Sequence, residues 1–297
     1  MSPRAPGGSA TSAAVRWRRL VRARRAEMER LCPGGGALGA PYWDSRARRF
    51  AARTAGSATG DPLLSRLRRV ARSSTTVLDV GAGPGRFALA LAPRVAAVVA
   101  VDASPVMGSL LRRAARREGL TNVTTVTGRW EELDVAPVDL GLCSYVLPLV
   151  EDAATFLAKL DAASLGDAFV YLSALSADVF SDPFWRHFHG RPRQPGPTYL
   201  DAVAVLAELG IGADVEVVEV RVRTRYSTVA AAAKAYRESL LLADTAEVRR
   251  ELRSLLSRWL VADGDALRPP LRTTPAAIIH WSTRRGGPAR SLPPPNR

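Results

Sequence analysis

The stretch VLDVGAGPGRFALALA, residues 77–92, decides the fold of this chain. It begins as an apolar strand pattern, passes through three closely spaced glycines and ends in a helical pattern. Gly81, Gly83 and Gly85 let the backbone turn sharply and approach a ligand where any β-carbon would collide. A glycine loop between a buried strand and a helix predicts a nucleotide-like ligand at the carboxyl end of that strand.

Strand and helix patterns alternate on both sides of this stretch. Strands are expected at 75–80, 96–102, 122–128, 138–147, 167–175, 213–226 and 275–282. Helices are expected at 86–92, 104–119 and 151–163, and a helical pair at 230–243 and 246–262. Short apolar strands that alternate with helices indicate right-handed crossovers and a parallel sheet covered on both faces. The sequence therefore predicts a doubly wound, Rossmann-like α/β domain with a seven-stranded, mostly parallel sheet and a helical insertion between the last two strands.

The segment before the first strand is predicted to form two helices. In residues 15–31, apolar residues share one face of a helix while arginines fill the others, and Pro41 starts a second helical pattern over 41–54. Packing onto the domain is the simplest role for both. We expect disordered tails at 1–14 and 284–297, an N-terminal helical extension at 15–72 and one cofactor-binding domain at 73–283.

The net charge of +14 belongs to the ends of the chain. Residues 1–72 carry 16 arginines against 4 acids, whereas residues 73–283 carry 22 basic and 24 acidic residues. Attraction to a nucleic acid would thus have to come from the termini. Two cysteines and three histidines favour neither a disulfide framework nor a metal centre. No apolar run is long enough to cross a membrane, so we expect a cytoplasmic protein that binds neither membrane nor metal.

The glycine spacing separates two kinds of nucleotide. A dinucleotide fingerprint would place its third glycine where Arg86 stands, and no phosphate-loop lysine follows. Asp79, two residues before the first glycine, would repel a pyrophosphate but suits a ligand that carries an ammonium group. Asp102 ends the next strand, where either kind of nucleotide would present its ribose.

These features resemble the class I S-adenosylmethionine-dependent methyltransferases. The resemblance implies that Asp79, Gly81, Gly83 and Gly85 hold the methionine part of the cofactor, and that Asp102, followed by Ala103, holds the ribose. It places Gly128, Arg129, Trp130 and Glu131 beside the adenine, and Cys143, Ser144 and Tyr145 near the reactive methyl group, with Tyr145 also facing the acceptor. The Asn/Asp-Pro-Pro-Tyr motif of enzymes that methylate exocyclic amines of bases is absent.

The stretch after the fifth strand, residues 176–210, gathers aromatic and basic residues at the expected acceptor side of the site. If the acceptor loses a proton, His187 or His189 is a candidate base. Trp185, Arg191 and Tyr199 are candidate acceptor-binding residues. A structured surface loop anchored by its aromatic residues is the plainer alternative.

Three functions stay open at this point. The first is methyl transfer to a small organic acceptor, the second is methylation of RNA bound by the basic N-terminal region, and the third is cofactor binding without transfer. The near-neutral body of the chain favours the first. The identity of the acceptor and the oligomeric state do not follow from the sequence.

Overall fold

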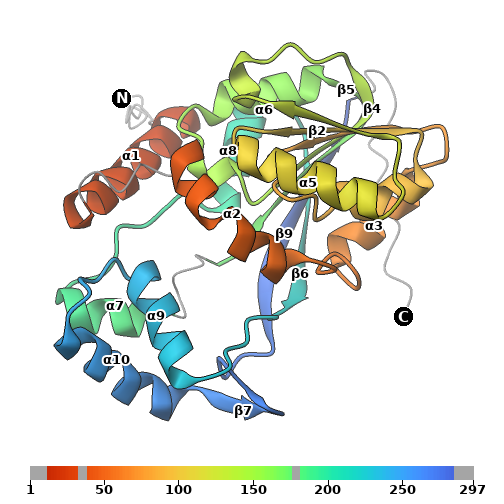
Figure 1. Cartoon of the computed structure of the whole chain (residues 1–297). Coiled ribbons are helices and arrows are strands. Elements are labelled where there is room, and N and C mark those ends of the chain that lie inside the picture. Colours follow the sequence, from red (N-terminus) through yellow and green to blue (C-terminus); the bar gives the residue numbers. More distant parts are fainter. Residues whose placement is uncertain (1–11, 33–38, 176–180, 284–297) are drawn as a thin grey trace, which may run out of the picture.

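The computed structural model describes residues 12–32, 39–175 and 181–283. Its centre is a seven-stranded sheet in the order β3-β2-β1-β4-β5-β9-β6, with helices on both faces (Figure 1). The strands are β1 (Thr76–Val80), β2 (Ala97–Asp102), β3 (Val123–Thr127), β4 (Val138–Ser144), β5 (Ser164–Ser173), β6 (Asp214–Arg221) and β9 (Thr273–Ser282). β1 to β5 run parallel and β9 runs antiparallel to both of its neighbours. The predicted Rossmann-like fold is therefore confirmed.

Each face of the sheet has its own apolar core. One face is covered by α6 (Ala153–Ala162) and α8 (Tyr199–Glu208), and α1 (Ala13–Leu31) packs on these two helices through Trp17 and Val21. The other face is covered by α3 (Pro62–Val70), α4 (Ala88–Leu91) and α5 (Pro105–Arg117). Buried Val, Leu and Ile side chains of the central strands contribute to both cores, as a sheet covered on two sides requires.

The N-terminal region differs from the expectation in two details. The tail boundary expected at residue 14 is wrong, because α1 begins at Ala13 and the Ser12 hydroxyl donates a hydrogen bond to Glu208. Helix α3 was not expected, although Asp61 caps its N-terminus by accepting a hydrogen bond from the Leu63 N–H. The expected tails at 1–11 and 284–297 lie outside the described residues. The helix α2 (Ala40–Thr54) forms as expected and packs on α5.

The insertion between β6 and β9 forms a lobe of its own below the sheet (Figure 1). It contains α9 (Val229–Ser239), α10 (Ala246–Trp259) and a hairpin of β7 (Val261–Asp263) and β8 (Ala266–Arg268). Helix α7 (Asp182–His189), from the segment after β5, joins this lobe and contributes Phe184 and Trp185 to its core. The predicted helical insertion is confirmed, whereas the segment after β5 is partly a helix of that lobe.

Three short 3-10 helices complete the fold. They are η1 (Ala92–Arg94), η2 (Trp130–Glu132) and η3 (Leu147–Leu149). η2 follows β3 and η3 follows β4, so both lie at the carboxyl ends of parallel strands, where doubly wound sheets place their ligands. In the part of the chain that the structure describes, no helix is both long and apolar enough to span a bilayer.

Candidate active site

Two cavities meet at the carboxyl ends of the parallel strands. The first, of about 970 Å³, lies over β1, β2 and β4, and we call it the strand-end cavity. The second, of about 790 Å³, lies between the sheet and the lower lobe, and we call it the arginine cavity. Tyr145 and Leu149 line both cavities, so the two spaces share a wall directly after β4.

The glycine loop forms the floor of the strand-end cavity. Gly81 and Gly83 line it with positive φ angles of 74° and 55°. A β-carbon on Gly81 would lie 2.1 Å from Val146 Cγ2, whereas one on Gly83 would meet only a Phe50 ring carbon at 3.8 Å. Gly81 is therefore required by packing between β1 and the turn after β4. Gly83 leaves its space to the cavity.

Asp102 fixes the loop and faces the strand-end cavity. One carboxylate oxygen accepts a hydrogen bond of 2.8 Å from the Gly83 N–H, and the other accepts one of 2.8 Å from the Ser104 N–H. A carboxylate has about four acceptor positions, so two remain for hydroxyl groups of a ligand. Burial raises the pKa of Asp102 despite these two bonds. The side chain thus has the geometry expected for a ribose-binding group.

Asp79 lies beneath the loop rather than on the cavity wall. Its side chain is only 2% exposed, and it accepts a hydrogen bond from the N–H of Ala88 in α4. Burial raises its pKa to about 7. Gly85 and Cys143 also lie outside the lining, with Gly85 packed against Leu89 and Cys143 fully buried. Burial raises the pKa of the Cys143 thiol to about 12, so this sulfur remains neutral.

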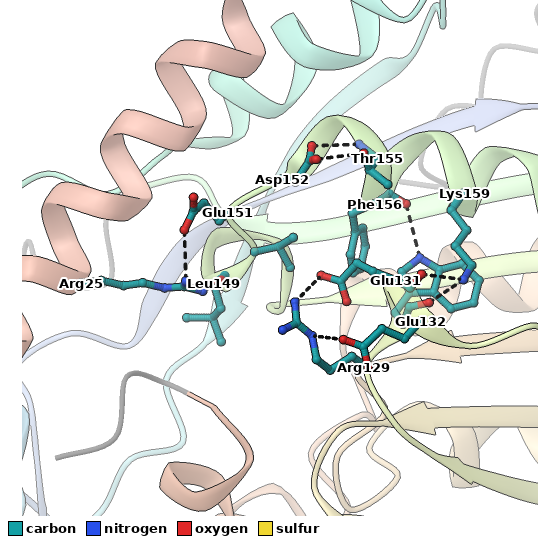
Figure 2. Close-up of polar contacts among 12 residues, drawn as sticks. Arg25, Arg129, Glu131, Glu132, Leu149, Glu151, Asp152, Thr155, Phe156 and Lys159 are labelled. Carbon is teal, nitrogen blue, oxygen red and sulfur yellow. Dashed lines mark hydrogen bonds and ion pairs between the residues drawn. The ribbon is translucent and has the colours of Figure 1, made fainter. Parts of the chain in front are cut away.

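The rim of the strand-end cavity carries acids and two arginines. Arg129 lies within 3.7 Å of Glu131 and 3.3 Å of Glu132, and Figure 2 shows its guanidinium between these carboxylates. Arg25 of α1 donates a hydrogen bond of 2.6 Å to the Leu149 carbonyl and lies 3.4 Å from Glu151 (Figure 2). Trp130 in η2 is buried and its indole N–H donates a hydrogen bond to the Phe156 carbonyl, but Trp130 still lines part of the cavity. Ala103 and Ser144 complete the expected set on this wall.

Helices α1 and α2 supply walls that the sequence did not assign to a site. Trp43 and Phe50 of α2 line the strand-end cavity, with their ring centroids 5.7 Å apart. Asp44 of the same helix accepts a hydrogen bond from the Ser104 hydroxyl, which ties α2 to the turn after β2. The helical periodicity predicted α2 but not what its Trp43–Phe50 face covers.

The arginine cavity has a markedly basic lining. Among the described residues that line it are the arginines Arg24, Arg53, Arg86, Arg193, Arg221 and Arg223 and the tyrosines Tyr42, Tyr145, Tyr199, Tyr226 and Tyr236. Asp61 is the one carboxylate among the described residues that line this cavity, and it pairs with Arg86 at 2.5 Å. Burial raises the pKa of Asp61 although Arg86 and Arg223 lie beside it.

The two histidines proposed as bases do not reach either cavity. His187 lies on the surface of the lower lobe with Nε2 2.6 Å from Glu251, and His189 Nε2 lies 2.8 Å from the Leu240 carbonyl. The interpretation of this pair as a catalytic base is therefore corrected. The physical reason is that α7 turns its aromatic face into the core of the lobe, and this orients the histidines toward α9 and α10 rather than toward the sheet.

Of the four residues expected on the acceptor side, two line the arginine cavity and two do not. Tyr145 and Tyr199 line the arginine cavity as expected. Trp185 is fully buried in the core of the lobe, and Arg191 lies 3.0 Å from the buried carboxylate of Glu27, so neither lines a cavity. Arg193, two residues further on, does line it, with its guanidinium 4.3 Å from the centroid of the Trp185 ring.

The comparisons with known proteins concern the family and the fold. Residues 77–163 match the family described as "Methyltransferase domain". The chain is 31% identical over 181 residues to a Haemophilus influenzae protein, covering 60% of this chain and 66% of that one. It is also 50% identical over 52 residues to the 23S rRNA (uracil(1939)-C(5))-methyltransferase RlmD of Chromohalobacter salexigens, which is 18% of this chain and 11% of that enzyme. The chain thus spans less than two thirds of the length of either relative.

Two solved structures share the fold. The YcgJ protein of Bacillus subtilis matches 75% of this chain and 97% of its own with a TM-score of 0.51 and 17% identity. BH2331 of Bacillus halodurans matches 74% of this chain and 98% of its own with a TM-score of 0.52 and 17% identity. The matched family identifies residues 77–163 as a methyltransferase domain, and the strand order and the two solved structures show that the chain has the Rossmann-like fold.

Proposed function

We propose that this protein transfers a methyl group from S-adenosylmethionine to a small organic acceptor. The strand-end cavity would hold the cofactor and the arginine cavity the acceptor. The observation that carries the proposal is that Tyr145 and Leu149 line both cavities, because ligands bound in two adjoining cavities can be held next to each other at the place where the cavities meet.

The strand-end cavity fits the cofactor by its chemistry. Asp102 has acceptor positions left for the ribose hydroxyls, Gly83 leaves room for close approach, and Trp130 borders the place of the adenine. In this assignment Asp79 acts through the loop that it braces and does not touch the ligand.

The chain's own contribution to the reaction is positioning and the exclusion of water. S-adenosylmethionine supplies, when bound, a methyl group on a positively charged sulfur that is displaced in line. Trp43 and Phe50 of α2 would cover the cofactor, and the Tyr145 side chain would lie beside the place where the two ligands meet. Holding the two reactants in line is the main requirement of such a displacement.

The RNA alternative is weakened by how α1 uses its arginines. Arg16 lies 2.9 Å from Asp201, Arg22 lies 2.5 Å from Glu151, and Arg18 lies 3.8 Å from Asp152. Charges that are paired with the protein's own acids are less available for phosphates. We also propose that residues 15–72 form an extension of the cofactor-binding domain at 73–283, because α1, α2 and α3 all pack on that domain. The proposed location of the protein is the cytoplasm.

The test is a parallel titration of the protein with S-adenosylmethionine, S-adenosylhomocysteine and NADH. Binding of the first two and not of NADH supports the assignment of the strand-end cavity. Transfer of a labelled methyl group is then measured on a small-molecule extract and on total RNA at two salt concentrations. Label in the extract supports the proposal, whereas salt-sensitive label in RNA alone would favour the alternative.

A further inference from the structure

We propose that the acceptor is an aromatic organic anion, which binds in the arginine cavity with its charged group among the guanidinium groups and its ring against the tyrosines. This inference rests on the proposed function, because it names the substrate class of the same site. It is carried by the composition of the lining, by a buried polar group without a partner, and by the far less basic lining of the neighbouring cavity.

The lining concentrates positive charge from parts of the chain that are far apart in sequence. Arg24 comes from α1, Arg53 from α2, Arg86 from the glycine loop and Arg223 from the segment after β6. Guanidinium groups stay protonated in proteins, so this charge persists at any physiological pH. Like charges gathered in one concave space repel one another, and a bound anion removes that repulsion. The cavity is thus organised to favour a negatively charged ligand.

The carboxylate in the described lining cannot neutralise this cluster. Asp61 is buried to 3% exposure and lies between Arg86 and Arg223. Arg223 also donates a hydrogen bond of 2.6 Å to the Thr59 carbonyl. A carbonyl orients a guanidinium without cancelling its charge. This contact therefore holds the Arg223 guanidinium in place for a ligand without neutralising it.

A buried hydroxyl on the same wall points to a polar ligand. Ser57 is 6% exposed, lines the cavity, and its Oγ has no hydrogen-bond partner among the described residues. Buried hydroxyl groups almost always have a partner, so one without a partner in a cavity wall needs an explanation. A ligand oxygen would provide it.

The tyrosines specify the rest of the ligand. Tyr226 and Tyr236 lie with ring centroids 6.3 Å apart, and Tyr145 lies against Tyr171 at 5.0 Å. Tyr42 and Tyr199 face the same space from α2 and α8. Rings of this kind offer flat apolar surfaces with a hydroxyl at the edge, which suits an aromatic body better than an inorganic ion.

The strand-end cavity is far less basic. Its described lining holds five carboxylates (Asp102, Glu131, Glu132, Glu151 and Asp152) against the two arginines Arg25 and Arg129, and Arg22 and Arg18 of α1 also pair with Glu151 and Asp152. The excess of positive charge that favours an anionic ligand therefore lies in the arginine cavity and not in the strand-end cavity.

An anionic acceptor also explains why no histidine is needed. If the nucleophile enters as a carboxylate or phenolate, its oxygen forms the new C–O bond while the C–S bond breaks and the sulfur keeps the electron pair. No proton has to be removed in that step. Nearby guanidinium groups favour the charged form of the acceptor, which lowers the pKa of a phenol in the cavity.

The inference is tested by isothermal titration in the presence of saturating S-adenosylhomocysteine. The probes are para-hydroxybenzoate and its neutral analogue para-hydroxybenzamide. We expect the anion to bind at least about tenfold more tightly than the amide, as the loss of a charge-assisted hydrogen bond predicts, and added salt to weaken it. Equal binding of the two probes, or binding of neither while S-adenosylhomocysteine binds, would overturn the inference.

A matched pair of variants locates the binding. The double variant Arg53→Gln/Arg223→Gln should weaken binding of para-hydroxybenzoate about tenfold or more and leave the affinity for S-adenosylhomocysteine unchanged. The control is Arg113→Gln/Arg116→Gln, which removes two exposed arginines from α5, outside both cavities. Equal loss in both variants would show that net charge alone attracts the anion, and that would also overturn the inference.

Two further outcomes keep this inference separate from the proposed function. Failure of S-adenosylhomocysteine to bind while the anion still binds would sink the proposed function and leave the anion site. Binding of an RNA oligonucleotide but of neither aryl probe, lost in the Arg53→Gln/Arg223→Gln variant, would make the cavity a nucleic-acid entrance and exclude an aromatic acceptor.

Discussion

The rings of Tyr145 and Tyr171 lie 5.0 Å apart between centroids at an angle of 59°, and Tyr145 is part of the wall that the two cavities share. Tyr145 adopts a left-handed backbone conformation, with a φ of 60°, and its N–H donates a hydrogen bond of 2.8 Å to the Tyr171 carbonyl. A non-glycine residue in this conformation costs about 1 kcal/mol or more. β4 is thus followed by a strained residue whose ring is held at the place where the ligands would meet.

Tyr145→Phe should keep this ring contact, so we expect the free energy of unfolding to change by less than about 0.5 kcal/mol. Tyr145→Ala retains the strained backbone but loses the ring pair, so it should destabilise the protein by about 1–2 kcal/mol. Chemical denaturation of both variants measures the difference. Equal stability of the two variants would show that the ring contact contributes nothing.

Asp102→Asn should weaken binding of S-adenosylhomocysteine about tenfold or more, because the ribose would lose a charged acceptor and the loop would lose a bond to Gly83. Isothermal titration measures the change. Asp265→Asn, in the exposed turn between β7 and β8, is the matched control and should bind normally. Unchanged affinity in Asp102→Asn would remove the ribose assignment.

Gly81→Ala and Gly83→Ala should behave differently although both glycines have positive φ angles. The new β-carbon at residue 81 would lie 2.1 Å from Val146 Cγ2, so we expect a loss of stability of several kcal/mol. At residue 83 the backbone strain alone should lower the stability, by about 1 kcal/mol. The new methyl group enters the cavity, however, and should weaken binding of the cofactor.

The double variant Gly81→Ala/Val146→Ala checks the steric part of this argument. Removing the valine methyl groups should recover part of the stability lost in Gly81→Ala, as thermal melting would show. No recovery at all would mean that backbone strain, rather than the contact with Val146, limits residue 81.

Asp79→Asn should change how stability depends on pH. Burial raises the pKa of Asp79 to about 7 in the folded protein, against 3.8 in the unfolded chain. Between these two values the folded state binds more protons than the unfolded state, so this group makes stability fall as the pH rises. The fall amounts to roughly 4 kcal/mol at most and should be absent in Asp79→Asn. The free energy of unfolding of the wild-type protein and of Asp79→Asn, measured from pH 4 to 8, tests this expectation. The same pH dependence in both proteins would contradict a raised pKa of Asp79.

The sequence determined the seven strands of the central sheet, most of the helices between them and the position of the glycine loop. These features depend on local patterns: apolar runs for strands buried on two sides, helical periodicity, and Gly81 and Gly83 at a turn with positive φ. Asp102 was found in the same way, because the end of the second parallel strand lies beside the end of the first in any sheet of this kind.

Only the tertiary structure decided which residues of the extension and of the insertion face a ligand. The arginines of the arginine cavity come from five or more separate segments, and no local pattern relates Arg24 to Arg223. The histidines were misjudged because the aromatic residues beside them pack into the lobe of α7, α9 and α10. Periodicity shows that a helix has an apolar face, but the long-range packing of that face decides whether it closes a core or lines a cavity.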